Sequence, residues 1–203
     1  MDITTLFFDV GGVLLTNGWD HVSREEAAKH FSYDYEDSEE RHQRVARPFE
    51  CGQMNLHDYL SEVVFFQDRS FTEADFTQFM ERQSQPHAAS LEVLRQLAGQ
   101  KKYQLATVNN ESLYVNLYRI RTFKLTDYFS AFFSSCFLGV MKPDCEIFQR
   151  TLHITQRKGE ECLFVDDREE NVAAAQQCGI HAVHLPQPQD LAKVLDTYGV
   201  VIT

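Results

Sequence analysis

Short apolar runs alternate with amphipathic stretches from residue 86 onward, and this alternation constrains the fold more than any other feature. The runs predict buried strands because they are short and almost wholly apolar: residues 103–108, 131–135, 162–165 and 182–185. The amphipathic stretches predict helices: residues 90–98, 112–121, 145–152, 170–178 and 189–198. Continuous apolar strands that alternate with helices are typical of a parallel sheet covered on both faces. The sequence therefore predicts an α/β fold with a doubly wound parallel sheet.

A further strand lies near the start of the chain, far in sequence from the others. Residues 4–10 are apolar and aromatic and are followed by Gly11, which predicts a buried strand and then a turn. Residues 16–85 contain no comparable run. A length of 203 residues fits one domain that carries an insert. We therefore predict a core formed by residues 1–15 and 86–203, with an α-helical cap at residues 16–85.

Helix starts mark the insert. Ser23, followed three residues later by Glu26, fits a capping box. Asn55 and Thr72 each precede an amphipathic stretch with an aspartate in its first turn. These three positions predict the beginnings of three helices.

Composition limits the class of partner. The 19 Lys and Arg against 30 Asp and Glu give a formal charge of −11, which disfavours a nucleic acid as partner. A small anion is compatible with this charge, because backbone amides and one lysine act locally. No apolar run is long enough for a membrane span, and the N-terminus lacks the basic region of a secretory signal. The five cysteines form no CxxC pair, so we expect reduced thiols and a cytoplasmic location.

Polar side chains follow four of the predicted strands. In chain order they are Asp9, Asn109, Asn110, Lys142, Asp166 and Asp167. Ligands of parallel α/β sheets bind beyond the carboxyl ends of the strands, where such residues meet. Carboxylates, amides and a lysine suit a hard divalent cation together with a phosphate group.

These segments resemble, in the same chain order, the four motifs of the haloacid dehalogenase-like (HAD) phosphohydrolases. The helical insert is similar to the mobile cap of that family. Within it, Glu50 and Gly52 resemble the Glu-x-Gly loop of the small sugar-phosphate phosphatases, which include enzymes similar to glucose-1-phosphate phosphatases. The resemblance covers nearly the whole chain. It implies Mg²⁺-dependent hydrolysis of a small phosphorylated metabolite.

The resemblance also implies which residues act as the nucleophile and as metal ligands. Asp9 takes the place of the nucleophile that attacks phosphorus and forms an aspartyl-phosphate. Asp9, the backbone carbonyl of Gly11 and Asp167 take the places of magnesium ligands, with Asp166 as a further ligand or orienting group.

The phosphate-binding roles fall on the neighbouring motifs. Lys142 would neutralise the phosphoryl oxygens and the carboxylates. The backbone amides of Val10 and Gly11 would cradle the phosphoryl group, which suits a glycine-containing turn. Asn109, together with Asn110, would donate amide hydrogen bonds to phosphate oxygens.

Gly11 departs from the family pattern, because most phosphatases of the family have an aspartate there. That aspartate protonates the leaving group, and general acid–base help is worth about 10²–10⁴-fold in rate. We therefore expect a slow phosphatase, a substrate with a good leaving group, or a substitute acid from the cap. His21, His42 and His57 are the candidates for that substitute.

Asn109 is a second departure, because the family has Ser or Thr at the start of that motif. Thr107 is the alternative match if the strand ends sooner. Three other functions stay open: a catalytically weak protein that binds phosphate or a metabolite, a hydrolytic dehalogenase, and a phosphotransferase such as a mutase, which nothing in the sequence favours. The pair Asp166 and Asp167 argues against the dehalogenase, which needs no metal.

Overall fold

The strand next to Asp9 lies at the centre of a parallel sheet. The structure, a computed structural model, describes residues 3–202. Its five strands follow the order β3-β2-β1-β4-β5, and every neighbouring pair is parallel. The strands are β1 (Thr5–Phe8), β2 (Gln104–Asn109), β3 (Ala131–Ser134), β4 (Cys162–Asp166) and β5 (His181–His184). The predicted doubly wound sheet is confirmed, and its order reverses beside β1, where such folds bind ligands.

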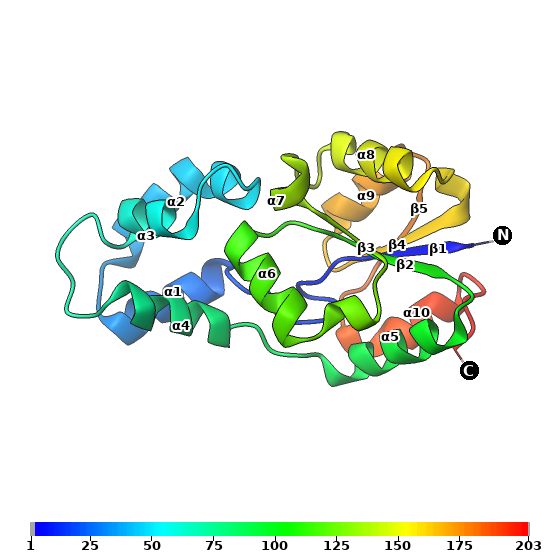
Figure 1. Ribbon diagram of the computed structural model, residues 1–203, viewed down its shortest axis with the longest axis horizontal. Coiled ribbons are helices and arrows are strands. Elements are labelled where there is room, and N and C mark those ends of the chain that lie inside the picture. The colour runs from blue at the N-terminus through cyan, green and yellow to red at the C-terminus, as the bar shows by residue number, and fades with distance from the viewer. Residues whose placement is uncertain (1–2, 203) are drawn as a thin grey trace.

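Helices cover both faces of the sheet (Figure 1). On one face, α5 (Ala88–Gln100) and α10 (Leu191–Asp196) pack on Leu6 and Phe8. On the other, α8 (Cys145–Thr155) and α9 (Glu169–Gln177) pack on Phe7. Leu6, Phe7 and Phe8 are all fully buried, which explains why this strand is apolar without alternation.

Shorter elements complete the core. They are α6 (Leu113–Thr122), α7 (Ser135–Leu138) and the 3₁₀ turns η1 (Leu125–Asp127), η2 (Gly159–Glu161) and η3 (Pro188–Asp190). None of the helices within residues 3–202 combines the length and the apolar character needed to cross a membrane.

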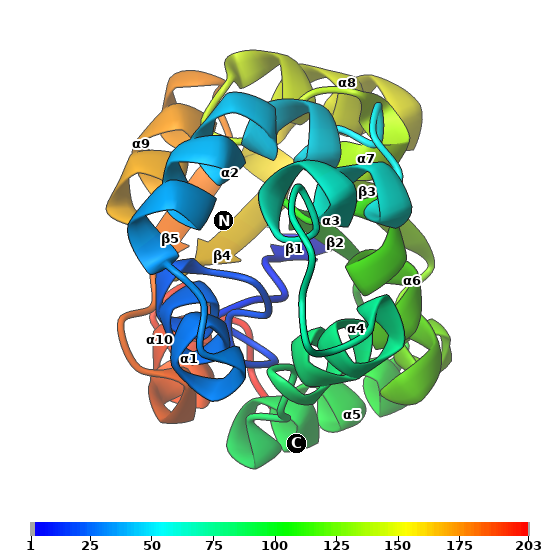
Figure 2. The ribbon, with the colours of Figure 1, turned by 90° about the vertical axis from the view of Figure 1, so that its left-hand side faces the viewer.

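Four helices between β1 and β2 form a separate group with its own apolar core. They are α1 (His21–Phe31), α2 (Tyr35–Glu50), α3 (Leu56–Val63) and α4 (Glu73–Arg82). Their core contains Trp19, Phe49, Tyr59, Phe76 and Met80. The group lies beyond one end of the sheet in Figure 1 and faces the viewer in Figure 2. It occupies the segment predicted as a helical cap, and the cap boundaries stay a prediction.

Two of the three expected helix starts are confirmed. The side chains of Asn55 and Thr72 cap α3 and α4 by accepting a backbone N–H of the first turn. The expected start at Ser23 is wrong, because α1 begins at His21. Asp20 caps it, accepting the Ser23 N–H at 2.9 Å. Aspartate is a strong N-cap residue, so the helix begins at the earlier capping residue.

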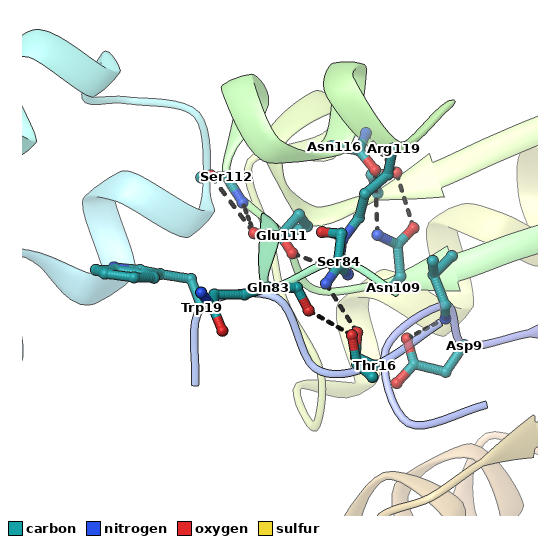
Figure 3. Close-up of polar contacts among 12 residues, drawn as sticks. Asp9, Thr16, Trp19, Gln83, Ser84, Asn109, Glu111, Ser112, Asn116 and Arg119 are labelled. Carbon is teal, nitrogen blue, oxygen red and sulfur yellow. Dashed lines mark hydrogen bonds and ion pairs between the residues drawn. The ribbon is translucent and has the colours of Figure 1, made fainter. Parts of the chain in front are cut away.

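Two linkers join the helical group to the sheet, and one buried arginine holds both (Figure 3). The Thr16 N–H donates to the Gln85 carbonyl at 2.8 Å, so the linkers pair with each other. Arg119 of α6 donates to the Thr16 carbonyl at 2.9 Å and to the Ser84 hydroxyl at 3.0 Å. Its guanidinium also pairs with Glu111 at 3.1 Å, and both side chains are buried. The linkers are thus anchored to the core through a buried ion pair.

Replacing Arg119 with Met should lower the free energy of unfolding by about 3–5 kcal/mol, because Glu111 is left buried without its partner. The double variant Arg119→Met/Glu111→Gln should recover part of this loss. Urea denaturation measures both effects. Arg95→Met is the matched control, since it breaks an exposed pair with Glu92 and should cost at most about 1 kcal/mol. A loss for Arg119→Met no larger than that of the control would contradict the anchoring role.

Candidate active site

Three carboxylates meet at the carboxyl edge of the sheet. Asp9 follows β1, and Asp166 and Asp167 lie at the end of β4. The two strands pair in parallel with Phe8 opposite Val165, and the Asp9 N–H donates to the Val165 carbonyl at 2.9 Å. One oxygen from each carboxylate therefore lies within 4.8 Å of the others. Such a set of oxygens can hold a hard divalent cation.

Lys142 supplies the positive charge next to these carboxylates. Its ammonium nitrogen lies 3.0 Å from Asp9 Oδ1 and 2.6 Å from Asp166 Oδ2, with 2% of the residue exposed. Asn110 fixes the lysine backbone from both sides. The Lys142 N–H donates to Asn110 Oδ1, and Asn110 Nδ2 donates to the Lys142 carbonyl, each at 2.8 Å. The structure thus brings Asp9, Asn110, Lys142 and the aspartate pair together at one edge of the sheet, and their roles stay a prediction.

The two aspartates after β4 have different surroundings. Asp166 is fully buried and accepts bonds from Lys142, from the Arg168 N–H at 2.8 Å and from Asn171 at 3.0 and 3.1 Å. In contrast, Asp167 Oδ1 is buried and has no hydrogen-bond partner within residues 3–202. A buried carboxylate oxygen without a donor is costly unless a cation binds it. Asp166 therefore suits an orienting role, and Asp167 suits a metal ligand.

Burial and concentrated negative charge shift the pKa values of these groups. Burial, against the attraction of Lys142 and with the added repulsion of Asp166 and Asp167, raises the pKa of Asp9 to about 7 in all. Burial also raises the pKa of Asp167, followed by the charge of Asp166. Burial lowers the pKa of Lys142, but Asp166 and Asp9 outweigh it and the net change is upward. One lysine faces three carboxylates, so an added cation would stabilise the ionised form of Asp9.

A tight turn carries the chain away from Asp9. The Val10 N–H donates to Asp9 Oδ1 at 2.7 Å. Gly12 has a φ of +73°, and a Cβ there would lie 2.1 Å from Asp167 Oδ2. Only glycine combines that backbone conformation with such a close approach. The turn can therefore pack directly against the aspartate pair.

Gly11 lies on the cavity wall, but the space where its side chain would begin is occupied. A Cβ at Gly11 would lie 2.7 Å from Asn17 Oδ1. The Asn17 amide, which has no acidic proton, therefore lies directly beside Gly11.

Asn109 does not reach the cavity. It is 1% exposed, its Nδ2 donates to Asn116 Oδ1 at 3.2 Å, and its Oδ1 accepts the Ser134 hydroxyl at 2.9 Å (Figure 3). The alternative Thr107 is fully buried within β2, and its hydroxyl has no partner in the described part of the chain. Strand β2 continues to Asn109, so it does not end earlier, as the match at Thr107 would require. The structure places Asn110 on the cavity wall, and a phosphate-binding role for Asn109 stays a prediction.

A cavity of about 530 Å³ lies between the carboxylates and the helical group. The core contributes Asp9, Asn110 and Lys142 to its wall, and the helical group contributes Trp19, His42 and Glu50. Its size suits a small organic molecule.

The histidines proposed as substitute acids differ in position. His21 and His42 line the cavity, whereas His57 is exposed on α3. His42 Nδ1 lies 2.8 Å from the Tyr59 hydroxyl. Burial, followed by the charge of Arg24, lowers the pKa of His42 to about 4. His42 is therefore neutral at pH 7 and has no proton ready to donate.

Sequence reasoning missed several residues that shape the site. Asn17 fills the space beside Gly11, Glu111 pairs with Arg119, and Asn171 holds Asp166. The position of Glu111, directly after Asn110 at a strand end, was the available signal. Asn17 and Asn171 gave no comparable signal, because their contacts depend on loop and helix packing.

Sequence comparison assigns the family. Residues 3–179 match the model of the haloacid dehalogenase-like hydrolases, so the chain belongs to this family. It is 26% identical to flavin mononucleotide hydrolase 1 of Arabidopsis thaliana over 163 residues, which cover 80% of this chain and 65% of that protein. It is 41% identical to the sesquiterpene phosphatase astK of Aspergillus oryzae over 59 residues, or 29% of this chain and 30% of that protein. The chain thus spans less than two thirds of the length of these curated relatives.

Solved structures confirm the fold. A HAD family enzyme from Bacteroides thetaiotaomicron has a TM-score of 0.82 at 22% identity, covering 96% of this chain and 99% of that one. A HAD-like family hydrolase from Porphyromonas gingivalis has a TM-score of 0.73 at 23% identity, covering 91% of both chains. At these identities the similarity shows the architecture, and the site must be argued from its own residues.

Stability should fall as the pH drops from 7 to 4, in part because His42 must take up a proton. Its pKa is lower in the folded chain than the ordinary 6.5, so its contribution is complete above pH 6.5 and is lost toward pH 4. A change from 6.5 to about 4 corresponds to about 3 kcal/mol. Urea denaturation at several pH values should show a smaller loss for His42→Gln than for the unmodified protein. An equal loss in His42→Gln and in the exposed-site control His57→Gln would contradict this assignment.

Proposed function

We propose that this chain is a phosphatase that hydrolyses small phosphomonoesters, with Asp9 as nucleophile and Mg²⁺ as cofactor. The observation that carries the proposal is the orphaned Asp167 Oδ1 in a cluster with Asp9, Asp166 and Lys142. This combination offers oxygen ligands for a cation and a fixed ammonium group for a phosphoryl oxygen. A dehalogenase reaction needs no metal.

The donor set fits magnesium, which prefers oxygen ligands and needs few from the protein. Asp9, Asp167 and the backbone carbonyl of Gly11 would hold the ion, and Asp166 orients Lys142. When bound, the ion screens the charge of the phosphate ester and keeps Asp9 ionised. The Bacteroides thetaiotaomicron enzyme was solved in complex with magnesium and inorganic phosphate, which supports this cofactor.

Each residue of the site then has its own role in the reaction. The ionised Asp9 carboxylate attacks phosphorus, and Lys142 stabilises the charge that develops on the phosphoryl oxygens. The amides of Val10 and Gly11 and the side chain of Asn110 surround the same group. Water hydrolyses the aspartyl-phosphate and restores Asp9.

The cavity wall favours a polar leaving group. Arg24 lies there and forms a two-pronged ion pair with Glu39, at 2.7 and 2.9 Å, and Gln43 lies beside them. These side chains offer hydrogen bonds to hydroxyl groups, which supports a sugar phosphate as substrate. The names of the two curated relatives point to other small esters, a flavin nucleotide and a sesquiterpene. We therefore propose small phosphomonoesters in general and sugar phosphates first, in a cytoplasmic protein.

Phosphate release from sugar phosphates, nucleotides and an aryl phosphate tests this function. Release should require Mg²⁺, stop in the presence of a chelator, and fall to background in Asp9→Asn, which lacks the nucleophilic carboxylate. Asp127→Asn, on an exposed turn of the core, is the control and should keep full activity.

Absence of phosphate release from every ester, in folded protein that still binds Mg²⁺, would overturn the enzymatic function. That result would favour the phosphate-binding alternative. Chloride release from a 2-chloro acid without Mg²⁺ would instead favour the dehalogenase. Two solved haloacid dehalogenases share the fold, with TM-scores of 0.62 and 0.66.

A further inference from the structure

Hydrolysis at Asp9 needs a proton donor for the leaving oxygen, and the usual position cannot supply one. Gly11 has no side chain, and the Asn17 amide occupies the adjoining space. His42 is held neutral by its low pKa. Another group on the cavity wall must carry the proton if esters with poor leaving groups are to react.

Glu50 carries a carboxyl group and lines the same cavity as Asp9 and Lys142. It is the last residue of α2 and is partly buried. Among the described residues, its carboxylate oxygens make no hydrogen bond or ion pair, and only more distant charges act on them. A cavity-facing carboxyl without a partner is free to interact with a bound substrate.

Three other glutamates line the same wall. Glu111 pairs with Arg119 at 3.1 Å and accepts the Ser112 N–H at 3.0 Å, and Glu39 pairs with Arg24. Glu170 is exposed and lies 4.0 Å from the Arg168 guanidinium. Each of these carboxylates has a guanidinium partner, whereas Glu50 has none among the described residues.

The core fixes the position of Glu50 although the residue belongs to the helical group. The Ser135 hydroxyl donates to the Glu50 carbonyl at 2.7 Å, and the same hydroxyl accepts the Glu111 N–H at 2.9 Å. Two residues on, a Cβ at Gly52 would lie 2.3 Å from the Cys136 carbonyl oxygen. Glycine thus allows the loop after α2 to dock against the first turn of α7. This contact holds the end of α2 at the wall of the cavity that Asp9 also lines.

We propose that Glu50 is the general acid and base of the phosphatase reaction, in place of the side chain missing at Gly11. The proposal rests on the proposed function. As the bond from Asp9 oxygen to phosphorus forms and the ester P–O bond breaks, the Glu50 proton passes to the leaving oxygen and an alcohol departs. Glu50 then takes a proton from the water that attacks the aspartyl-phosphate. Inorganic phosphate leaves, and Asp9 and protonated Glu50 are restored.

The protonation of Glu50 agrees with this role. Burial, followed by the negative charge of Glu111, raises its pKa to about 7, against the opposing charges of Arg168 and Arg24. The upward shift keeps a protonated form of Glu50 available at neutral pH. Because the protonated form reacts first, kcat/KM for an alkyl phosphate should fall as the pH rises above 7.

The experiment compares Glu50→Gln with the unmodified protein on two esters, in the presence of Mg²⁺. One is an alkyl phosphate such as a hexose 6-phosphate, whose alkoxide is a poor leaving group. The other is p-nitrophenyl phosphate, whose leaving group departs without a proton. We expect kcat/KM to fall by about 10²–10⁴-fold for the alkyl ester and by less than about 10-fold for the aryl ester. The decline of the alkyl reaction above pH 7 should disappear in the variant.

Two control variants separate chemistry from structure. Glu50→Asp keeps a carboxyl group and should recover part of the alkyl-ester activity. Glu36→Gln removes an exposed carboxylate from the same helix, away from this cavity wall, and should leave the activity on both esters unchanged. An equal loss on both esters in Glu50→Gln would overturn the proton-transfer role and leave the phosphatase function intact. If the unmodified protein hydrolyses neither ester, both the proton-transfer role of Glu50 and the phosphatase function are overturned.

Discussion

The ion pairs of Lys142 with Asp9 and Asp166 are the constraint on which the rest of the site depends. A buried lysine between two carboxylates is stable only if its geometry is fixed, because each buried charge is costly without its partners. Asn110 fixes the lysine backbone, and Asn171 fixes Asp166. The parallel register of the central strands brings these groups to one edge, so the sheet itself sets the charge arrangement.

The helical group completes the site from the other side. Its linkers are paired with each other and anchored by Arg119, while the end of α2 docks on Ser135. The cavity is therefore enclosed by two anchored parts, one with Asp9 and one with the free carboxyl group of Glu50. We propose that the core binds and attacks the phosphoryl group, and that the helical group recognises the leaving group and supplies its proton.

Much of this arrangement follows from local sequence. Apolar runs gave the strands, and polar residues after them gave Asp9, Lys142 and the aspartate pair, because parallel strands end at one edge. Local sequence does not show which way a side chain points. Asn109 turns to Asn116, while its neighbour Asn110 lines the cavity. Contacts between distant segments, such as Arg119 on both linkers or Asn17 beside Gly11, depend on packing that no local pattern encodes.

The central claim is that Asp9 forms a covalent aspartyl-phosphate. Rapid acid quench during turnover, followed by mass spectrometry of peptides, tests it directly. We predict one phosphoryl group on the peptide that contains Asp9. With p-nitrophenyl phosphate, whose leaving group needs no proton, the trapped fraction should be larger in Glu50→Gln, where water is activated more slowly. Turnover with no phosphorylated Asp9 at any time, or with the phosphoryl group on another residue, would contradict it.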